Sequence, residues 1–400
     1  IRFSGHCRFT SRIWLARLQT RVGSGPCRTL ELQHIMNTFA ELGLRQELVD
    51  AVQKLGFDEP TPIQAQVIPL LLEGNDVIGQ AQTGTGKTAA FALPILNKIA
   101  TNAESGEKVA RGRGQVQALV VCPTRELANQ VTRSFKDFAA FGGVRVLSVY
   151  GGQPYPPQRT ALRKGVDVVV GTPGRLLDLI RRGDLDLSEA HTIALDEADE
   201  MLSMGFVEDI EIILKSFPNE HQTLLFSATM PKSIRGLAND LMNNPVNIEV
   251  AAVSAPAERI KQCVYYVDKA HKPAMLAHLL GKLPITRAIV FTRTKHGADK
   301  VCRVLRKHRF EAQAIHGNKS QNARQRSLDG FKSGKVMVLV ATDIASRGID
   351  VDEVSHVFNY DLSNDPESYV HRIGRTARAG CSGEAISFCD REERGYLSDI

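Results

Sequence analysis

The sequence has few cysteines and no long apolar segment. Its seven cysteines are scattered without a C-x-x-C pair, so neither a zinc site nor a disulfide framework is expected, and a reducing, cytoplasmic setting fits best. No uninterrupted apolar run approaches the ~20 residues that a membrane-spanning helix needs, so no membrane partner is expected. Hydrophobic residues make up 43% of the chain and charged residues 24%, which is typical of a globular protein in water.

Net charge is almost absent beyond the first 35 residues. Residues 1–35 contain six arginines against one acid, Glu31, so this stretch supplies nearly all of the formal charge of +6. Charge alone therefore does not predict that the rest of the chain binds nucleic acid.

We expect residues 1–35 to be an atypical basic leader, unstructured or not native. The chain begins with Ile1, and a new pattern starts at Met36, which favours upstream sequence joined to a gene whose natural start is Met36. A composition rich in arginine and poor in acids is also typical of an organellar transit peptide. A folded or RNA-binding arm is the third alternative.

The remaining chain is too long for one ordinary core, so two domains are expected. Short runs rich in Val, Ile and Leu alternate with helical stretches, which predicts α/β domains with parallel sheets covered by helices on both faces. The small, proline-containing stretch at 251–259 predicts a linker between domains at 36–250 and 260–400. The predicted strands lie in "QALVVCP", "RVLSVYG", "DVVVGTP", "TIALDEAD", "QTLLFSAT", "CVYYV", "RAIVFTRT", "EAQAIHG", "VMVLVATD", "HVFNYD" and "EAISFC".

Unusual polar clusters follow the ends of these runs. They are "PTRELA", "TPGR", "DEAD", "SAT", "TRT", "HG" and "ATD". In open parallel sheets ligands bind outside the carboxyl ends of the strands. Both domains are therefore expected to present functional loops at the same kind of sheet edge.

The stretch "AQTGTGKT" at 81–88 follows an apolar pair and precedes a helical run. Glycines let backbone N–H groups curl around phosphate oxygens, the lysine neutralises the β- and γ-phosphates, and the final threonine can ligate Mg²⁺. The strict P-loop pattern wants glycine where Ala81 stands, so a chance glycine-rich loop stays open on this stretch alone. The predicted nucleotide contacts are Ala81, Gln82, Thr83, Gly84, Thr85, Gly86, Lys87 and Thr88.

"TIALDEAD" supplies the expected partner of such a loop. Asp196 ends a buried strand and suits Mg²⁺, while Glu197 could orient and deprotonate an attacking water. A solvated acidic turn is the alternative.

An ordered set of motifs gives a specific resemblance. From Phe39 to the last residue, the chain resembles the DEAD-box ATP-dependent RNA helicases of superfamily 2, and its "MNTFAELGL" and "FCDREERGYL" are most similar to the bacterial RhlE type. Ala81 is the family's usual residue, and Ala377 replaces the second glycine of its frequent "RTGRAG". The motifs are "GFDEPTPIQ", "AQTGTGKT", "PTRELA", "GG", "TPGR", "DEAD", "SAT", "VFTRT", "QNAR", "ATDIASRGID" and "HRIGRTARAG".

The resemblance implies two RecA-like domains and an ATP site between them. In the Q motif, Gln64 would read adenine, because an amide both donates and accepts, and Phe39 would pack on the base. Ordinary helix packing is the alternative for Phe39. Asp350 would meet the ribose.

The arginines of "HRIGRTARAG" are assigned by the same resemblance. Arg375 and Arg378 would reach the γ-phosphate across the cleft as arginine fingers, while His371 and Arg372 would tie their loop to "DEAD" and "SAT". A solvated basic turn or a direct RNA contact is the alternative. The hydroxyls of Ser227 and Thr229 could bond Asp199 and couple ATP to closure, although a simple strand-end turn would look the same.

The family's RNA contacts lie on glycines, arginines and hydroxyl residues, which suit phosphates. No aromatic stacking platform is evident, so little sequence preference and strong salt dependence are expected; a structural role is the alternative for each position, and RNA rather than DNA rests on the resemblance alone. These contacts map to Thr124, Arg125, Gly151, Gly152, Thr172, Gly174, Arg175, Arg293, Gly317, Arg324 and Thr342.

The sequence thus predicts an enzyme in which RNA and ATP close two domains and hydrolysis reopens them. We expect local, non-processive unwinding of short RNA duplexes or remodelling of RNA–protein complexes, by a monomer that uses ATP and Mg²⁺. Ribosomal and mRNA complexes are both plausible settings. Two rivals stay open: a motor acting on DNA, and an ATP-dependent RNA clamp with negligible unwinding.

Overall fold

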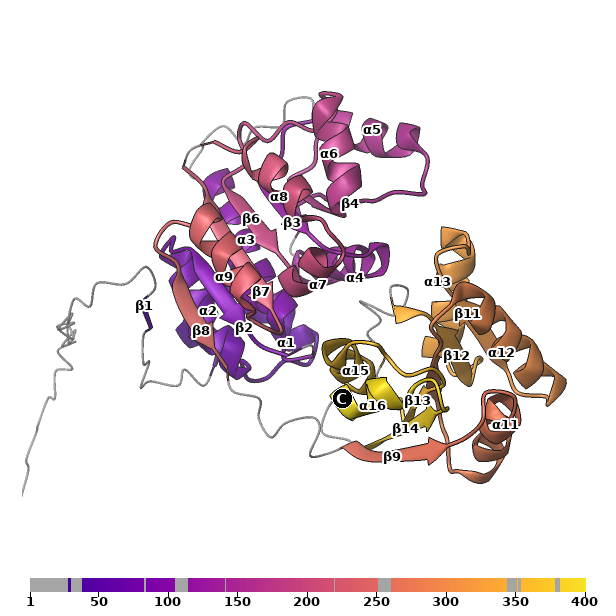
Figure 1. Cartoon of the computed structure of the whole chain (residues 1–400). Helices are drawn as coiled ribbons and strands as arrows, with labels where there is room; N and C mark the ends of the chain where they lie inside the picture. The colour runs from indigo at the N-terminus through magenta and orange to yellow at the C-terminus, as the bar shows by residue number, and fades with distance from the viewer. Residues whose placement is uncertain are drawn as a thin grey trace, which may run out of the picture.

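The computed structural model describes residues 28–29, 38–82, 84–104, 114–140, 142–218, 220–250, 260–343, 351, 354–377 and 382–400. These residues form two sheets in separate parts of the molecule (Figure 1), each with helices packed against it. All strand pairs in both sheets are parallel, as the alternation of apolar runs and helices predicts. Among the described residues, no helix combines the length and apolarity that crossing a membrane requires.

The first sheet has eight strands and the second has six. In spatial order, the first contains β1 (Arg28–Thr29), β8 (Val246–Glu249), β2 (Val77–Gln80), β7 (Gln222–Ser227), β6 (Thr192–Leu195), β3 (Ala118–Val121), β5 (Val168–Gly171) and β4 (Val146–Val149). The second contains β11 (Ala312–Ile315), β12 (Val338–Ala341), β10 (Ala288–Phe291), β13 (His356–Asn359), β14 (Gly383–Cys389) and β9 (Ile260–Tyr266).

Helices connect these strands in each half of the chain. Those before residue 251 are η1 (Phe39–Leu42), α1 (Gln46–Lys54), α2 (Pro62–Leu72), α3 (Lys87–Glu104), α4 (Arg125–Phe138), α5 (Tyr155–Arg163), α6 (Pro173–Arg181), α7 (Ala198–Ser203), α8 (Val207–Leu214) and α9 (Lys232–Leu241). Those after it are α11 (Lys272–Lys282), α12 (Lys295–Lys307), α13 (Gln321–Lys332), α15 (Pro366–Ile373) and α16 (Arg394–Asp399).

Both faces of the central strands in each sheet are buried, which explains why these strands read as continuous apolar runs, whereas the edge strand β9 is largely exposed. On β3, Ala118 and Val120 join one core while Leu119 and Val121 join the core on the opposite face. The second sheet divides in the same way between two further clusters. Because side chains alternate across a strand, burial on both faces favours apolar residues along the strand and gathers most polar residues at its ends.

Each apolar run that the sequence singled out contains a strand, and three strands were missed: β2, which holds the apolar pair before the phosphate loop, β8 and β1. The strand β8 lies in the half-polar stretch "VNIEV", and β1 falls within the predicted leader, where it pairs with β8. The rest of the leader and the predicted linker, 251–259, lie outside the described residues.

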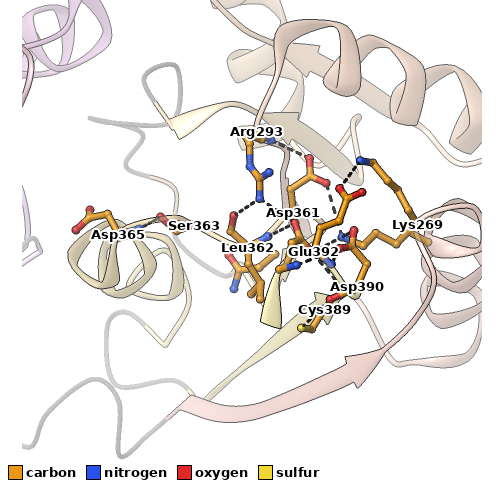
Figure 2. Close-up of polar contacts among 12 residues, drawn as sticks. Lys269, Arg293, Asp361, Leu362, Ser363, Asp365, Cys389, Asp390 and Glu392 are labelled. Carbon is orange, nitrogen blue, oxygen red and sulfur yellow. Dashed lines mark hydrogen bonds and ion pairs between the residues drawn. The ribbon is translucent and has the colours of Figure 1, made fainter. Parts of the chain in front are cut away.

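A buried ionic network stabilises the second sheet's end and the segment that follows β14. Lys272 is fully buried, and its Nζ lies 2.6 Å from Glu393 Oε2, 3.2 Å from Asp390 Oδ2 and 3.8 Å from Asp361 Oδ1. The other oxygen of Glu393 accepts from Arg293 Nη2 (3.0 Å) and from the backbone N–H of Leu362 (3.1 Å). Figure 2 shows Arg293, Asp361 and Asp390 converging from separate segments.

We expect Glu393→Ala to destabilise the protein by about 3 kcal/mol, because removing one partner of a buried ion pair leaves charge uncompensated. Glu392→Ala is the matched control, since Glu392 pairs with Lys269 where both side chains are about three-quarters exposed. Denaturant unfolding compares the two variants. Equal midpoints for both would contradict a stabilising role of the buried network.

Candidate ATP and RNA sites

The predicted motifs lie at the carboxyl ends of the strands in both sheets. The loop 81–86 follows β2, Asp196 follows β6, and Ser227 ends β7. These three strands belong to the same parallel sheet, in which β2 and β6 both pair with β7. The phosphate loop and the acidic motif are therefore brought to one edge, as the rule for open parallel sheets predicts.

The phosphate loop has the backbone that its glycines predict. Gly84 and Gly86 adopt φ of 85° and 88°, in the left-handed region that favours glycine. A Cβ on Gly86 would lie 2.4 Å from Gln64 Nε2, so only glycine fits. Lys87 begins α3, and its buried ammonium donates to Ala81 O at 2.8 Å. The loop thus presents a helix N-terminus and a lysine together, which suits a phosphate chain.

Gln64 and Phe39, the predicted adenine contacts, are both buried. The Gln64 amide donates to Gly86 O (3.1 Å), and its oxygen accepts from the N–H of Thr61 (2.9 Å). Gln64 thus joins α2 to the phosphate loop, and its reading of adenine stays a prediction. Phe39 is only 2% exposed and packs in the core, which favours the helix-packing alternative. Its stacking on adenine also stays a prediction.

The acidic motif is a row of buried carboxylates. Asp196 is 3% exposed and Glu197 is 7% exposed. Burial raises the pKa of Asp196 to about 7 although the Lys87 ammonium opposes the shift. Burial also raises the pKa of Glu197, against the charges of Arg375 and Lys87. Since Arg375 belongs to the second domain, its charge acts on the motif from across the interface.

The carboxylates fit a hydrated metal–nucleotide better than a solvated turn. Glu197 Oε2 is buried and has no hydrogen-bond partner among the described residues, although buried polar atoms normally find one. Glu197 also adopts a left-handed backbone with φ of 55°, which is uncommon outside glycine. Oxygen donors such as Asp196 and Thr88 are the ligands that Mg²⁺ prefers. The residues present therefore fit Mg²⁺ with ATP and a water.

Asp199 bonds the end of β7, as "SAT" predicts. Asp199 Oδ2 accepts from the Thr229 hydroxyl at 3.0 Å and from the backbone N–H groups of Thr229 and Ala228 at 2.9 and 3.1 Å. The predicted Thr229 contact is confirmed. The Ser227 hydroxyl instead donates to Thr229 O at 2.6 Å, so the Ser227 contact with Asp199 was wrong. Ser227 shapes the turn that presents Thr229.

His371 bridges the two domains, whereas Arg372 does not. His371 Nδ1 lies 2.5 Å from Glu200 Oε1, beside the acidic motif. Arg372 was expected to do the same, but its guanidinium bonds Asp343 at 2.5 and 2.8 Å and Asp361 O at 2.7 Å, all within the second domain. This corrects the expectation, and the reason is local: Arg372 is 2% exposed and has an acid of its own domain beside it. Thr83, Asp350 and Arg378 lie outside the described residues.

Most predicted RNA contacts line one hollow between the domains, with a volume of about 510 Å³. Eight of the eleven predicted positions meet there, so the structure brings together residues that are far apart in the sequence. They are Thr124, Arg125, Gly151, Thr172, Gly174 and Arg175 from the first domain, and Gly317 and Arg324 from the second.

Three predicted RNA contacts lie outside the lining of this hollow. A Cβ on Gly152 would lie 2.3 Å from Arg125 Nη1, so Gly152 makes room for that guanidinium. Arg293 Nη2 donates to Glu393 Oε1 (3.0 Å) and to Leu362 O (3.2 Å). Figure 2 shows the bond to Leu362. Thr342 follows β12. Their contacts with RNA stay predictions.

Arg175 has a structural role inside the hollow, which was the alternative to RNA contact for each predicted position. Its guanidinium donates to Gln153 O (3.1 Å) and to Gln158 Oε1 (3.0 Å), and it lies 4.0 Å from the ring centroid of Tyr155. Burial lowers its pKa, with Arg125 and Arg182 adding to the effect. Arg175 therefore holds the wall of the hollow, whether or not it also meets a phosphate.

The motifs did not predict several functional neighbours. Glu126, inside "PTRELA", accepts from Arg324 Nη2 (2.7 Å) and from Gln321 Nε2 (3.0 Å) across the hollow. In the sequence, Glu126 is an acid in the first turn of an amphipathic helix. Such an acid is also expected simply because it stabilises the helix dipole, so the sequence did not mark Glu126 as an interdomain contact. Tyr155 and Phe206 also line the hollow, so aromatic side chains are present where none was expected.

Comparisons with known proteins agree with this geometry. Residues 61–237 match the DEAD/DEAH box helicase family, and residues 271–380 match the helicase conserved C-terminal domain. The chain is 51% identical over 365 residues to the DEAD-box ATP-dependent RNA helicase CshA of Geobacillus kaustophilus, covering 91% of this chain and 76% of that protein. The RhlE-type likeness is not confirmed, because such relatives carry the name CshA.

Two solved structures support the fold in the same way. Dbp5 of S. cerevisiae bound to RNA and ADP BeF3 aligns with a TM-score of 0.80 and 33% identity, covering 91% of this chain and 92% of that chain. Mss116p bound to ssRNA and AMP-PNP aligns with a TM-score of 0.81 and 28% identity, covering 93% and 78%. The two α/β domains are thus RecA-like, and the chain belongs to the DEAD-box family of ATP-dependent RNA helicases.

Proposed function

We propose that this helicase hydrolyses ATP in response to RNA and uses the closure of its two domains to separate short RNA duplexes locally. One observation carries the proposal: side chains of the second domain contact buried carboxylates of the first at both sites, with His371 Nδ1 2.5 Å from Glu200 Oε1 and Arg324 Nη2 donating to Glu126 Oε2 at 2.7 Å. The hollow lined from both domains supports a shared RNA site. The proposed domain boundaries are residues 36–250 and 260–400, with 251–259 as linker and 1–35 as leader.

At the ATP site, the chain supplies a cradle and a base. The loop 81–88 binds the phosphates through its N–H groups and Lys87, with Gln64 and Asp350 as contacts to adenine and ribose. Mg²⁺, held by Thr88 and Asp196, supplies neutralisation of phosphate charge when bound. The buried, unpartnered oxygen of Glu197 orients the attacking water and accepts its proton.

Arg375 and Arg378 complete the site from the second domain. A guanidinium donates in a fixed fork that matches phosphoryl oxygens, and it acts only when the domains are together. Arg375 is 6% exposed, and its Nε donates to His371 O at 3.2 Å, so the contact that bridges to Glu200 also positions the finger. RNA binding that favours this arrangement raises the hydrolysis rate.

RNA binding is proposed to follow the backbone rather than the bases. Glycines and hydroxyl groups in the hollow admit phosphates, and Arg324 exchanges Glu126 for a phosphate oxygen. Bending of the bound strand separates a short duplex without long-range translocation. A monomer in the cytoplasm, acting on ribosomal or mRNA complexes, is the proposed setting.

The first test is ATP hydrolysis by the full chain with no nucleic acid, single-stranded RNA or DNA of matching sequence. We expect stimulation by RNA alone, and Lys87→Ala removes the signal as a control. Stimulation by DNA would identify a DNA motor instead. ATP binding without hydrolysis under any condition would identify a clamp.

Arg375→Ala should lower kcat by about 10³ or more with little change in the KM for ATP, because an arginine finger acts in the transition state. Steady-state kinetics with saturating RNA measure both constants. Arg391→Ala, at a side chain that is 86% exposed, is the control and should behave as wild type. A rise in KM that accounts for the whole loss would point to ground-state binding.

The His371–Glu200 contact predicts a pH dependence. Burial disfavours the charged imidazole and would lower the pKa of His371. The hydrogen bond to Glu200 and the negative charges of Glu200 and Asp199 outweigh burial, so this pKa is raised. Its stabilising contribution is complete below the ordinary pKa of about 6.5 and is lost as pH rises through the raised value. His371→Gln should therefore lower the Tm more at pH 6 than at pH 9.

His278→Gln, at an exposed histidine, is the control for this comparison and should lower the Tm little at either pH. A gap between wild type and His371→Gln that is the same at both pH values would show that the charge of His371 is irrelevant to the contact.

A further inference from the structure

A second cavity, the basic pocket, lies in the second domain beside the edge strand β11. Its volume is about 610 Å³, and α12 and α13 form its other walls (Figure 1). Four cationic side chains line it, and Asp299 is the one acid among its lining residues. The cations are Arg303, Arg306, Lys319 and Arg326. None of the predicted motifs includes any of them.

The positive charge of the basic pocket is not neutralised from within. Asp299 pairs with Lys319 at 2.9 Å. Arg306 Nε donates to Ala312 O (2.8 Å) and Arg326 Nε to Asn322 O (3.3 Å), which fixes each side chain without cancelling its charge. No described acid lies within ion-pair distance of Arg303, Arg306 or Arg326. Three guanidiniums around a concave surface attract an anion and match phosphate geometry.

The basic pocket adjoins the RNA hollow through two shared elements. On the loop after β11, Gly317 lines the hollow and Lys319 lines the pocket, and two residues of chain span at most about 7 Å. On α13, Arg324 lines the hollow while Arg326 and Ser327 line the pocket. An RNA strand in the hollow would therefore meet the basic pocket next on the second domain.

We propose that the basic pocket is a phosphate-binding subsite that holds the RNA strand where it extends beyond the hollow. This inference rests on the proposed function. The lining offers guanidinium and ammonium groups and no aromatic ring, so it binds the backbone without reading bases. Its contribution is affinity for longer RNA, and it leaves the ATP site untouched.

The test compares two charge-reversal variants of the full chain. Arg303→Glu with Arg326→Glu changes the pocket, and Lys300→Glu with Lys307→Glu makes the same charge change on the exposed surface of α12 outside it. Fluorescence anisotropy measures binding of RNAs of about 6 and about 16 nucleotides over a range of salt concentrations, in the presence of a non-hydrolysable ATP analogue.

The pocket variant should bind the longer RNA roughly tenfold more weakly, with a salt slope lower by about 1.4, because each lost single-strand phosphate contact removes about 0.7. Its binding of the short RNA should match the control variant, and its RNA-free ATP hydrolysis should match wild type. Equal behaviour of the two variants on both RNAs would overturn the proposal.

Adding tripolyphosphate to the binding assay tests whether RNA or a free phosphate compound occupies the basic pocket. Competition with the longer RNA but not the shorter one supports the subsite. Tripolyphosphate binding that the pocket variant loses, with RNA binding unchanged, would overturn the RNA assignment in favour of a free anion. Failure of wild type to bind either RNA would contradict the proposed function itself, which separates that failure from loss of the subsite alone.

Discussion

Four carboxylates at Asp196, Glu197, Asp199 and Glu200 are nearly buried together, and buried charges need partners because desolvation is costly. Within the first domain, Lys87 acts on Asp196 and Glu197. The turn after β7 bonds Asp199, and the Ser203 hydroxyl donates to Glu200 Oε2 at 3.4 Å. The second domain adds the charge of Arg375 near Glu197 and the contact of His371 with Glu200. Both domains therefore contribute charged groups to the acidic motif, so the relative position of the domains affects its electrostatics.

At the hollow, too, a buried carboxylate of the first domain is paired with side chains of the second domain. Glu126 is buried in the first domain, and Arg324 and Gln321 of the second domain are its partners. Burial lowers the pKa of Arg324 although Glu126 opposes the shift. Arg324 lines the hollow and also holds Glu126 of the first domain, so the proposed RNA site and an interdomain contact share this side chain.

The sequence predicted the two sheets and placed most candidate site residues at strand ends, because parallel strands in a covered sheet leave a plain apolar signal with polar residues at their carboxyl ends. It missed β8 because "VNIEV" alternates polar and apolar residues at the margin of the sheet. Arg372 could not be assigned, because its partners Asp343 and Asp361 become neighbours only through packing. Glu126 was hidden for a similar reason: its partners lie about two hundred residues away along the chain.

Asp361 connects the loop that carries Arg293 to α15 within the second domain. Its carboxylate accepts from the backbone N–H of Arg293 (2.9 Å), and its carbonyl accepts from Arg372 Nη1 (2.7 Å) on α15. Glu393 and the buried Lys272 fix the same loop from behind. Because α15 leads directly to Arg375, these hydrogen bonds link the loop that carries Arg293 to the segment that carries the proposed arginine finger.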